Sequence, residues 1–157
     1  MDTQVYRASV AGIIVNQNKE FLLTQLNISK KEEYDFVKGG MDIGENEIET
    51  LNREIKEELG KNIDFEIIQR SDVFIIYEWP EDLKKNSGYR GQARVSYWIF
   101  YKGGNIKLAK KELKKANWVA EENVKEMLKK GHFPDLILEN IWKEWLQIKK
   151  QKAHLFN

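Results

Sequence analysis

One amphipathic helix, placed between segments rich in β-branched and aromatic residues, limits the folds open to this chain of 157 residues. Its apolar side chains recur every three or four residues, which is the period of one helical face. They are Ile48, Leu51, Ile55 and Leu59. Asn46 followed three positions later by Glu49 has the form of a capping box, and Gly60 stands where such a helix ends. The sequence therefore predicts a helix bounded by Asn46 and Gly60, with one face buried by these four residues.

Segments with strand character lie on both sides of this helix. Before it, "ASVAGIIVN" and "EFLLTQL" are separated by "QNK" and predict a hairpin or meander of two core strands. After it, "FEIIQRSDVFIIYEW" and "QARVSYWIFYKGG" predict further strands. Neither face of the last segment is purely polar, so we expect a sheet that is covered on both sides.

The rest of the chain predicts a loop and two closing helices. "PEDLKKNSGYRG" is a charged stretch that predicts a long loop of the kind that lies over a site. "EENVKEMLKKG" and "PDLILENIWKEWLQIKK" predict helices, the first ended by Gly131 and the second begun by Pro134. Strands, a central helix, more strands and terminal helices predict an α/β fold with a mixed sheet between helical layers.

Length and composition exclude several classes of protein. Residues 1–157 have the size of one domain, and the chain has no cysteine from which to build a disulfide or thiolate metal site. The longest apolar runs are too short to span a membrane, and the N-terminus lacks the pattern of a secretory signal. We therefore expect a single soluble, cytoplasmic domain with no membrane association and no obligate protein partner. The charges, 26 basic against 25 acidic, argue against a protein that grips a long nucleic acid.

Three glutamates lie together on the predicted helix. Glu54, Glu57 and Glu58 are three and four residues apart, so they share one side and repel by roughly 0.2–0.5 kcal/mol per exposed pair. Converging carboxylates suit a hard divalent cation, while the same short motif is also typical of a solvated acidic face. The preceding loop, "KGGMDIGE", brings backbone N–H groups to a helix N-terminus, where phosphate binds readily. Metal beside phosphate indicates phosphoanhydride chemistry.

A longer pattern surrounds these glutamates. In order it reads Gly39, five residues, Glu45, seven residues, Arg53, Glu54, Ile55, one residue, Glu57, Glu58, one residue and Gly60. The pattern resembles the Nudix box of the Nudix hydrolase family. The resemblance implies the Nudix fold, an α/β/α sandwich with a mixed sheet, and hydrolysis of a nucleoside diphosphate linked to another group.

The same resemblance implies roles for the charged residues. The metal ligands by position are Glu54, Glu57 and Glu58. The ion would be Mg²⁺, with Mn²⁺ as a substitute, and it would lower the pKa of the attacking water. Either Glu58 or Glu54 would take the proton, and the sequence leaves both open. Arg53 belongs to the catalytic set; with Glu45 it would hold loop and helix in register, and Gly60 would support the site at the end of the helix.

A second segment narrows the resemblance to one branch of this family. "YEWPEDLKKNSGYRGQARVSYWIF" resembles bacterial RNA 5′-pyrophosphohydrolases and the related asymmetric diadenosine tetraphosphate hydrolases, so that the likeness extends from about residue 8 to residue 146. In that branch an acidic residue lies six positions before a Trp, as Glu112 does before Trp118. Glu112 would be a remote metal ligand or would assist the base; a solvated glutamate is the alternative.

Further residues are implied in substrate binding. Phe133 has the position of an aromatic that stacks on a base, with a plain core Phe as the alternative. Lys38 would neutralise a phosphate beside the glycines Gly39 and Gly40. Three more residues would meet base or phosphates, or else only water: Tyr89, Arg90 and Arg94.

Three functions stay open on the sequence. The first is hydrolysis of a dinucleoside polyphosphate, such as diadenosine tetraphosphate, or of a 5′-triphosphate RNA end. The second is a housekeeping nucleoside triphosphate pyrophosphohydrolase. The third is a Nudix module that binds a nucleotide without cleaving it; retention of all the metal carboxylates argues against this one.

Overall fold

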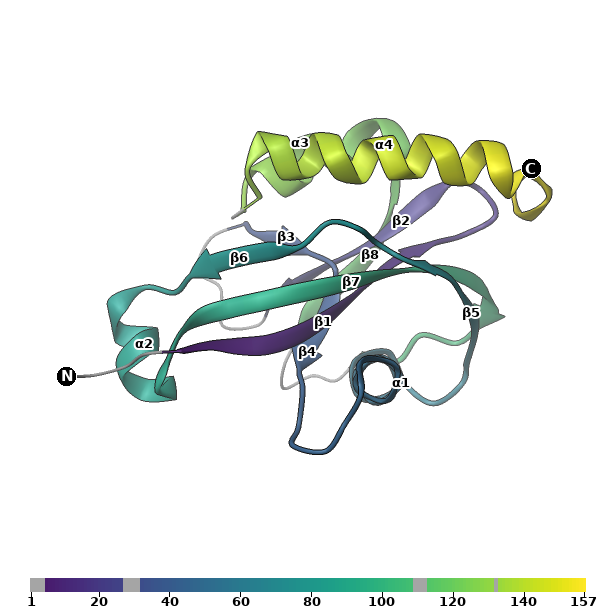
Figure 1. The fold of residues 1–157 in the computed structure, drawn as a ribbon. Coiled ribbons are helices and arrows are strands. Elements are labelled where there is room, and N and C mark those ends of the chain that lie inside the picture. Colours follow the sequence, from purple (N-terminus) through teal and green to yellow (C-terminus); the bar gives the residue numbers. More distant parts are fainter. Residues whose placement is uncertain (1–4, 27–31, 109–112, 132) are drawn as a thin grey trace.

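A mixed β-sheet lies between two helical layers. The computed structural model describes residues 5–26, 32–108, 113–131 and 133–157. Helix α1 (Glu47–Leu59) covers one face of the sheet, and helices α3 (Glu121–Lys129) and α4 (Asp135–Gln151) cover the other (Figure 1). The predicted α/β/α sandwich is therefore confirmed.

The described residues form a sheet of eight strands around a long parallel pair. The strands are β1 (Val5–Val15), β2 (Glu20–Leu26), β3 (Tyr34–Asp35), β4 (Val37–Gly40), β5 (Ile63–Arg70), β6 (Ile75–Glu78), β7 (Tyr89–Gly104) and β8 (Leu113–Ala120). The order is β3-β2-β1-β7-β5, with β4 beside β1, β6 beside β7 and β8 beside β2. β1 runs parallel to β7 and antiparallel to β2 and β4. The predicted β1–β2 hairpin is confirmed.

The segment expected to be a long charged loop contains a helix. Helix α2 (Glu81–Ser87) follows Pro80, has Glu81 and Asp82 in its first turn and ends at Gly88, whose φ is 78°. These are ordinary helix start and stop signals, so the loop prediction was wrong for this part of the segment. Helix α4 begins after Pro134, as predicted, and a short 3₁₀ helix, η1 (Ala153–Leu155), follows it.

Helix α1 has the predicted caps and a different buried face. Asn46 Oδ1 accepts a hydrogen bond from the Glu49 N–H at 2.8 Å, so the capping box is confirmed. Leu51, Ile55 and Leu59 are buried, but Ile48 is 37% exposed. Ile48 lies in the first turn, where it lines an open pocket of about 410 Å³. The helix also buries Thr50, Glu54 and Glu58, so two of the three glutamates do not belong to a solvated acidic face, the alternative that the sequence left open.

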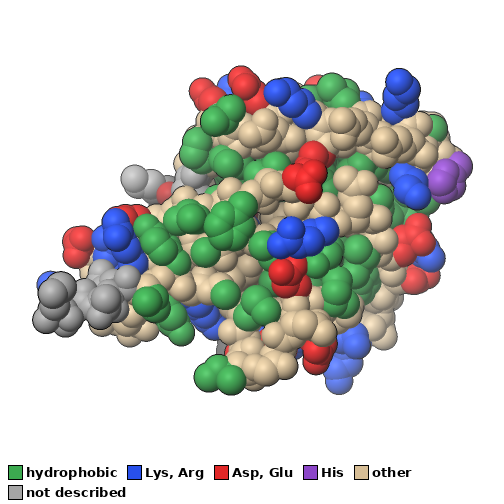
Figure 2. Space-filling view, in the orientation of Figure 1, with side chains coloured by type: hydrophobic (Ala, Val, Ile, Leu, Met, Phe, Trp, Pro, Cys, Tyr) green, Lys and Arg blue, Asp and Glu red, His purple; other side chains and the backbone are tan. Residues whose placement is uncertain are grey.

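Charged side chains of both signs are interspersed on the face of the molecule shown in Figure 2, as the balanced composition predicts. Hydrophobic side chains also reach this surface. Among the helices of the described residues, none has the length and apolar character needed to cross a membrane.

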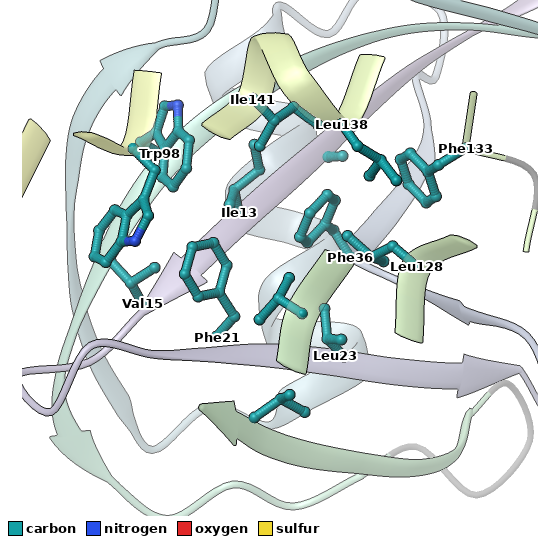
Figure 3. Packing of buried hydrophobic residues seen from close by; sticks show 14 of the residues in the cluster. Ile13, Val15, Phe21, Leu23, Phe36, Trp98, Leu128, Phe133, Leu138 and Ile141 are labelled. Atoms are coloured by element: carbon teal, nitrogen blue, oxygen red, sulfur yellow. The ribbon is translucent and has the colours of Figure 1, made fainter. Parts of the chain in front are cut away.

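Two hydrophobic clusters lie on the two faces of the sheet. Strand β7 contributes to both, because Trp98 belongs to the cluster under α4 and Ile99 to the one under α1. The strand predicted to be covered on both sides is therefore covered in this way. Trp98 stacks on Trp145 of α4, with centroids 5.8 Å apart. Figure 3 shows the larger cluster, in which Phe21, Phe36 and Phe133 all point into the interior.

Candidate active site

Two successive glycines in β4 admit side chains from the two sides of the sheet. A Cβ atom on Gly39 would lie 1.9 Å from Glu54 Cδ, so only glycine lets this carboxylate pack against the strand. A Cβ atom on Gly40 would lie 2.2 Å from Cζ of Arg7. Because neighbouring strand residues face opposite sides, Glu54 of α1 occupies one face of β4 and Arg7 of β1 the other. The glycine pair is thus a structural requirement of both contacts.

Arg53 ties the loop before α1 to the helix. Its Nε and Nη2 atoms donate to the two carboxylate oxygens of Glu45, each at 2.8 Å, and Nη2 also donates to the Gly40 carbonyl at 2.9 Å. Glu45 accepts further hydrogen bonds from the Asp42 N–H at 2.8 Å and the Thr50 hydroxyl at 3.0 Å. The hydrogen bonds from Arg53, then from Asp42, lower the pKa of Glu45 to about 2. The bonds to Glu45 in turn raise the pKa of Arg53. Loop and helix are therefore fixed to each other at this point.

The remaining nitrogen of Arg53 lies between two glutamates. Nη1 is 2.8 Å from Glu54 Oε1 and 3.3 Å from Glu57 Oε2. Glu57 is exposed, whereas Glu54 and Glu58 are buried. Within the described residues no three acidic, His or Cys side chains gather closely enough to form a metal site. Two of the three predicted ligands nevertheless converge on one cationic nitrogen, and their oxygens are of the kind that Mg²⁺ prefers.

Three of the residues predicted to meet phosphate or base each lie beside a different charged side chain of the protein. Lys38 Nζ is 3.4 Å from Asp35 Oδ2. The Tyr89 ring lies beside the Arg7 guanidinium, and the distance between the ring centroid and Arg7 Cζ is 5.9 Å. Arg90 pairs with the carboxylate of Glu78. Glu112, the predicted remote carboxylate, lies outside the described residues.

Two predicted substrate contacts lie in the interior. Arg94 is fully buried, because it faces the α4 side of β7 beneath the helical layer. The sequence predicted a residue that meets substrate or water, and this prediction was wrong about its exposure. Phe133 is 5% exposed and packs edge-on against Phe36, with centroids 5.7 Å apart. A stacked base needs an open ring face, so the core alternative describes Phe133 here.

The sequence reasoning missed the residues around Arg94. Asp35 of β3 is 4% exposed and binds the Arg94 guanidinium through both carboxylate oxygens. A signal was present, because Asp35 stands directly between the aromatic residues Tyr34 and Phe36. A buried carboxylate requires a partner, and arginine can bind it through two nitrogens.

Comparison with known proteins places this geometry in a family. The model of the NUDIX domain matches residues 5–138. The chain is 28% identical to an RNA pyrophosphohydrolase of Campylobacter jejuni, over 96% of each chain. Among solved structures it resembles a NUDIX hydrolase from Nitrosomonas europaea, with a TM-score of 0.66, 17% identity and 90% of each chain covered. It also resembles a C. elegans Ap4A hydrolase in a binary complex, with a TM-score of 0.65, 17% identity and coverage of 90% of this chain and 98% of that one. With the family model covering most of its length, this chain belongs to the Nudix hydrolase family.

Proposed function

We propose that this Nudix hydrolase cleaves a phosphoanhydride bond in the polyphosphate of an RNA 5′ end or of a short nucleotide. The observation that carries the proposal is the convergence of Glu54 and Glu57 on Arg53 Nη1, directly beside the glycines of β4. Carboxylates that already share a cation are suited to a divalent ion, and the glycine loop that leads into α1 is suited to phosphate.

Two substrates are favoured by separate observations. Similarity to an RNA pyrophosphohydrolase over 96% of both chains supports a 5′-triphosphate RNA end. The formal net charge of +1 supports a short substrate such as diadenosine tetraphosphate, because a long RNA draws affinity from a basic surface. The same site chemistry serves both, since each presents a chain of three or more phosphates.

The metal ligands in this proposal are Glu54, Glu57 and Glu58, with Glu112 as a further one. When bound, Mg²⁺ or Mn²⁺ lowers the pKa of water and neutralises charge on the leaving phosphate. Arg53 has to release at least one of its two Nη1 contacts when these carboxylates turn to an ion. Its Nε and Nη2 contacts to Glu45 are separate and keep the helix in place meanwhile.

The chain's own groups have distinct tasks in the reaction. Either Glu54 or Glu58 accepts the proton of the attacking water, a step that typically contributes 10²–10⁴-fold. Lys38 neutralises a phosphate from β4, one position before Gly39.

A substrate panel tests the proposal. The protein is incubated with Mg²⁺ and separately with 5′-triphosphate RNA, diadenosine tetraphosphate and each nucleoside triphosphate, and the products are resolved by chromatography. We expect pyrophosphate and a 5′-monophosphate RNA, or ATP and AMP, and no product in excess chelator. Cleavage of nucleoside triphosphates alone would establish the housekeeping alternative. Binding of nucleotides without any product would establish the non-catalytic module.

A further inference from the structure

Helix α1 begins without apolar packing. No hydrophobic side chain is buried in its first turn, residues 47–50, all of which the structure describes. Ile48 is exposed there and lines the open pocket of about 410 Å³ together with Met41 and Tyr97. The buried apolar side chains of the helix all lie in later turns; they are Leu51, Ile55 and Leu59. The start of α1 therefore depends on another kind of attachment to the sheet.

Glu47 provides this attachment. Its Oε1 atom accepts hydrogen bonds from the Tyr97 hydroxyl of β7 at 2.7 Å and from Arg70 Nε of β5 at 2.9 Å. Arg70 Nη2 donates to the other oxygen at 3.4 Å. The hydrogen bonds from Arg70, then from Tyr97, lower the pKa of Glu47, so this carboxylate is ionised at neutral pH. We name these three residues the Glu47 cluster; it ties the first turn of α1 to two strands.

The Glu47 cluster and β4 hold the helix at two separate places. Glu47 and Glu54 are seven residues apart, which is close to two full turns, so both face the sheet about 10 Å apart along the helix axis. Glu54 packs against Gly39 of β4, and β1 lies between β4 and β7. A helix attached at one place can pivot about it. Attachments on the two sides of β1 prevent this movement.

A series of contacts joins the Glu47 cluster to the candidate active site. Glu47 follows Glu45 by two positions, and Glu45 accepts hydrogen bonds from Arg53 on both of its oxygens. Arg53 Nη1 in turn lies 2.8 Å from Glu54 and 3.3 Å from Glu57. A displaced first turn carries Glu45 with it and shifts Arg53. The two carboxylates that Arg53 Nη1 contacts then shift as well.

We propose that Tyr97 and Arg70 are positioning residues, which set the place of the Glu54 and Glu57 carboxylates by holding Glu47. They act through Glu47 and the contacts of Arg53, and the divalent ion is held by other residues. Small errors in the placement of reacting groups lower turnover strongly, so this attachment matters to catalysis. The inference rests on the proposed function, which makes these carboxylates metal ligands.

The competing explanation is a cluster that stabilises the fold alone. The side chains of Glu47 and Arg70 are 33% and 50% exposed, and ion pairs of this kind contribute little to stability. In that case loss of the contacts leaves the metal affinity and the turnover of the folded protein unchanged. The two explanations therefore differ in a property that can be measured without substrate.

The test is a set of four linked variants. Tyr97→Phe removes one hydroxyl and keeps the ring, and Glu47→Met removes both acceptor oxygens with a side chain that favours a helix. The third is the double variant Glu47→Met/Tyr97→Phe. The conservative Glu47→Gln keeps an oxygen that can accept from the Tyr97 hydroxyl. For each we measure the Kd for Mn²⁺ by electron paramagnetic resonance without substrate, then kcat and KM with the best substrate of the panel at saturating Mg²⁺. Circular dichroism reports folding and the melting temperature.

Glu47→Met should raise the Mn²⁺ Kd and lower kcat, each by about tenfold, which is typical for loss of a residue that orients metal ligands. Tyr97→Phe should change both by about threefold. KM should stay within about twofold, because neither side chain is asked to touch the substrate. The double variant should lie within about twofold of Glu47→Met, since Tyr97 acts through Glu47. Glu47→Gln should stay within about twofold of wild type.

Two control variants are matched to these changes. Tyr101→Phe removes a hydroxyl from the same side of β7, where it donates to the Gly104 carbonyl of β7 itself. Glu66→Met removes a partly exposed ion pair with Lys102 that also joins β5 to β7. Both controls should keep the wild-type Mn²⁺ Kd and kcat.

Two negative results are distinguishable. Folded Glu47→Met and Tyr97→Phe proteins with the wild-type Mn²⁺ Kd and the wild-type kcat overturn this inference alone. A wild type that binds no Mn²⁺ and hydrolyses no polyphosphate of the panel overturns the proposed function, and the inference with it.

Discussion

Arg53 and Arg94 each bind one carboxylate through two nitrogens, yet their surroundings differ in charge and in access. The side chain of Arg53 is 27% exposed, and Glu45, Glu54 and Glu57 surround it, so acid is in excess. Arg94 has no exposed surface, and within the described part of the chain its partner Asp35 is shared with Lys38, so two positive charges meet one negative charge there.

The difference means that the carboxylates around Arg53 can exchange one cation for another, whereas the Asp35–Arg94 pair is a fixed part of the fold. The contact between Arg53 and the exposed Glu57 can be exchanged for a metal ion at small cost, because exposed ion pairs contribute only about 0–1 kcal/mol. A buried pair cannot open in this way, because each separated charge would remain desolvated. We therefore expect changes around Arg53 to affect catalysis most and changes around Arg94 to affect stability most.

The largest effect should come from breaking the buried pair. Arg94→Met leaves the Asp35 carboxylate without its bidentate partner and should lower the free energy of unfolding by about 3–5 kcal/mol. Arg53→Met, at the partly exposed cluster, should lower it by about 1 kcal/mol. Urea denaturation followed by circular dichroism measures both. Equal losses for the two variants would remove the distinction between fixed and exchangeable clusters.

The next effect concerns turnover and the one exposed glutamate beside Arg53 among the described residues. Glu57→Gln should reduce kcat/KM by about 100-fold, or about 2.7 kcal/mol of barrier, and leave the melting temperature nearly unchanged. The reason is that Glu57 is exposed, with Arg53 at 3.3 Å as its ion-pair partner, so its carboxylate contributes little to packing.

Glu126→Gln is the matched control, because Glu126 is an exposed helical glutamate beside a lysine on α3. It should retain full activity. A Glu57→Gln protein that loses stability in proportion to its activity would make the acidic face structural.

The contacts of Arg53 were expected because its partners are local. The resemblance to the Nudix box implied that Glu45 and Arg53 hold loop and helix in register, and helix spacing placed Glu54 and Glu57 on one side. Burial of Glu54 was not predictable in the same way. It depends on Gly39 of β4, which leaves the space for the carboxylate, and glutamate is otherwise an exposed residue.

The buried pair of Asp35 and Arg94 was not predicted because the two residues meet only in the finished sheet. Asp35 and Arg94 are 59 positions apart and lie on strands that β1 separates, so strand order and register bring them together. The same limit explains Phe133, since a residue before a helix has no period from which burial can be inferred. The alternation along β7, by contrast, predicted correctly that both faces of the sheet are covered.

The glycines of β4 offer a comparison across the two faces of one strand. Gly39→Ala places a Cβ atom 1.9 Å from Glu54 Cδ and should move this buried carboxylate, lowering kcat/KM about tenfold. Gly40→Ala places a Cβ atom 2.2 Å from Arg7 Cζ, the end of a long, partly exposed side chain that can turn aside. Its effect should be under threefold. A larger loss for Gly40→Ala than for Gly39→Ala would move the reacting groups to the Arg7 side of β4.

The smallest effect is a dependence of stability on pH that arises at Glu45. Hydrogen bonds from Arg53 and Asp42 hold its pKa at about 2, below the ordinary value of 4.5, so the folded protein binds a proton here less readily than the unfolded chain. The contribution of Glu45 to stability is therefore complete above about pH 4.5 and is lost as the pH falls toward 2. Glu45→Gln should lower the melting temperature slightly at pH 7, and the difference from wild type should shrink between pH 4.5 and pH 2. Calorimetric scans across this range measure it, at low salt, because ions screen a partly exposed pair. Parallel curves for the two proteins would mean that Arg53 holds the loop through the Gly40 carbonyl rather than through the Glu45 carboxylate.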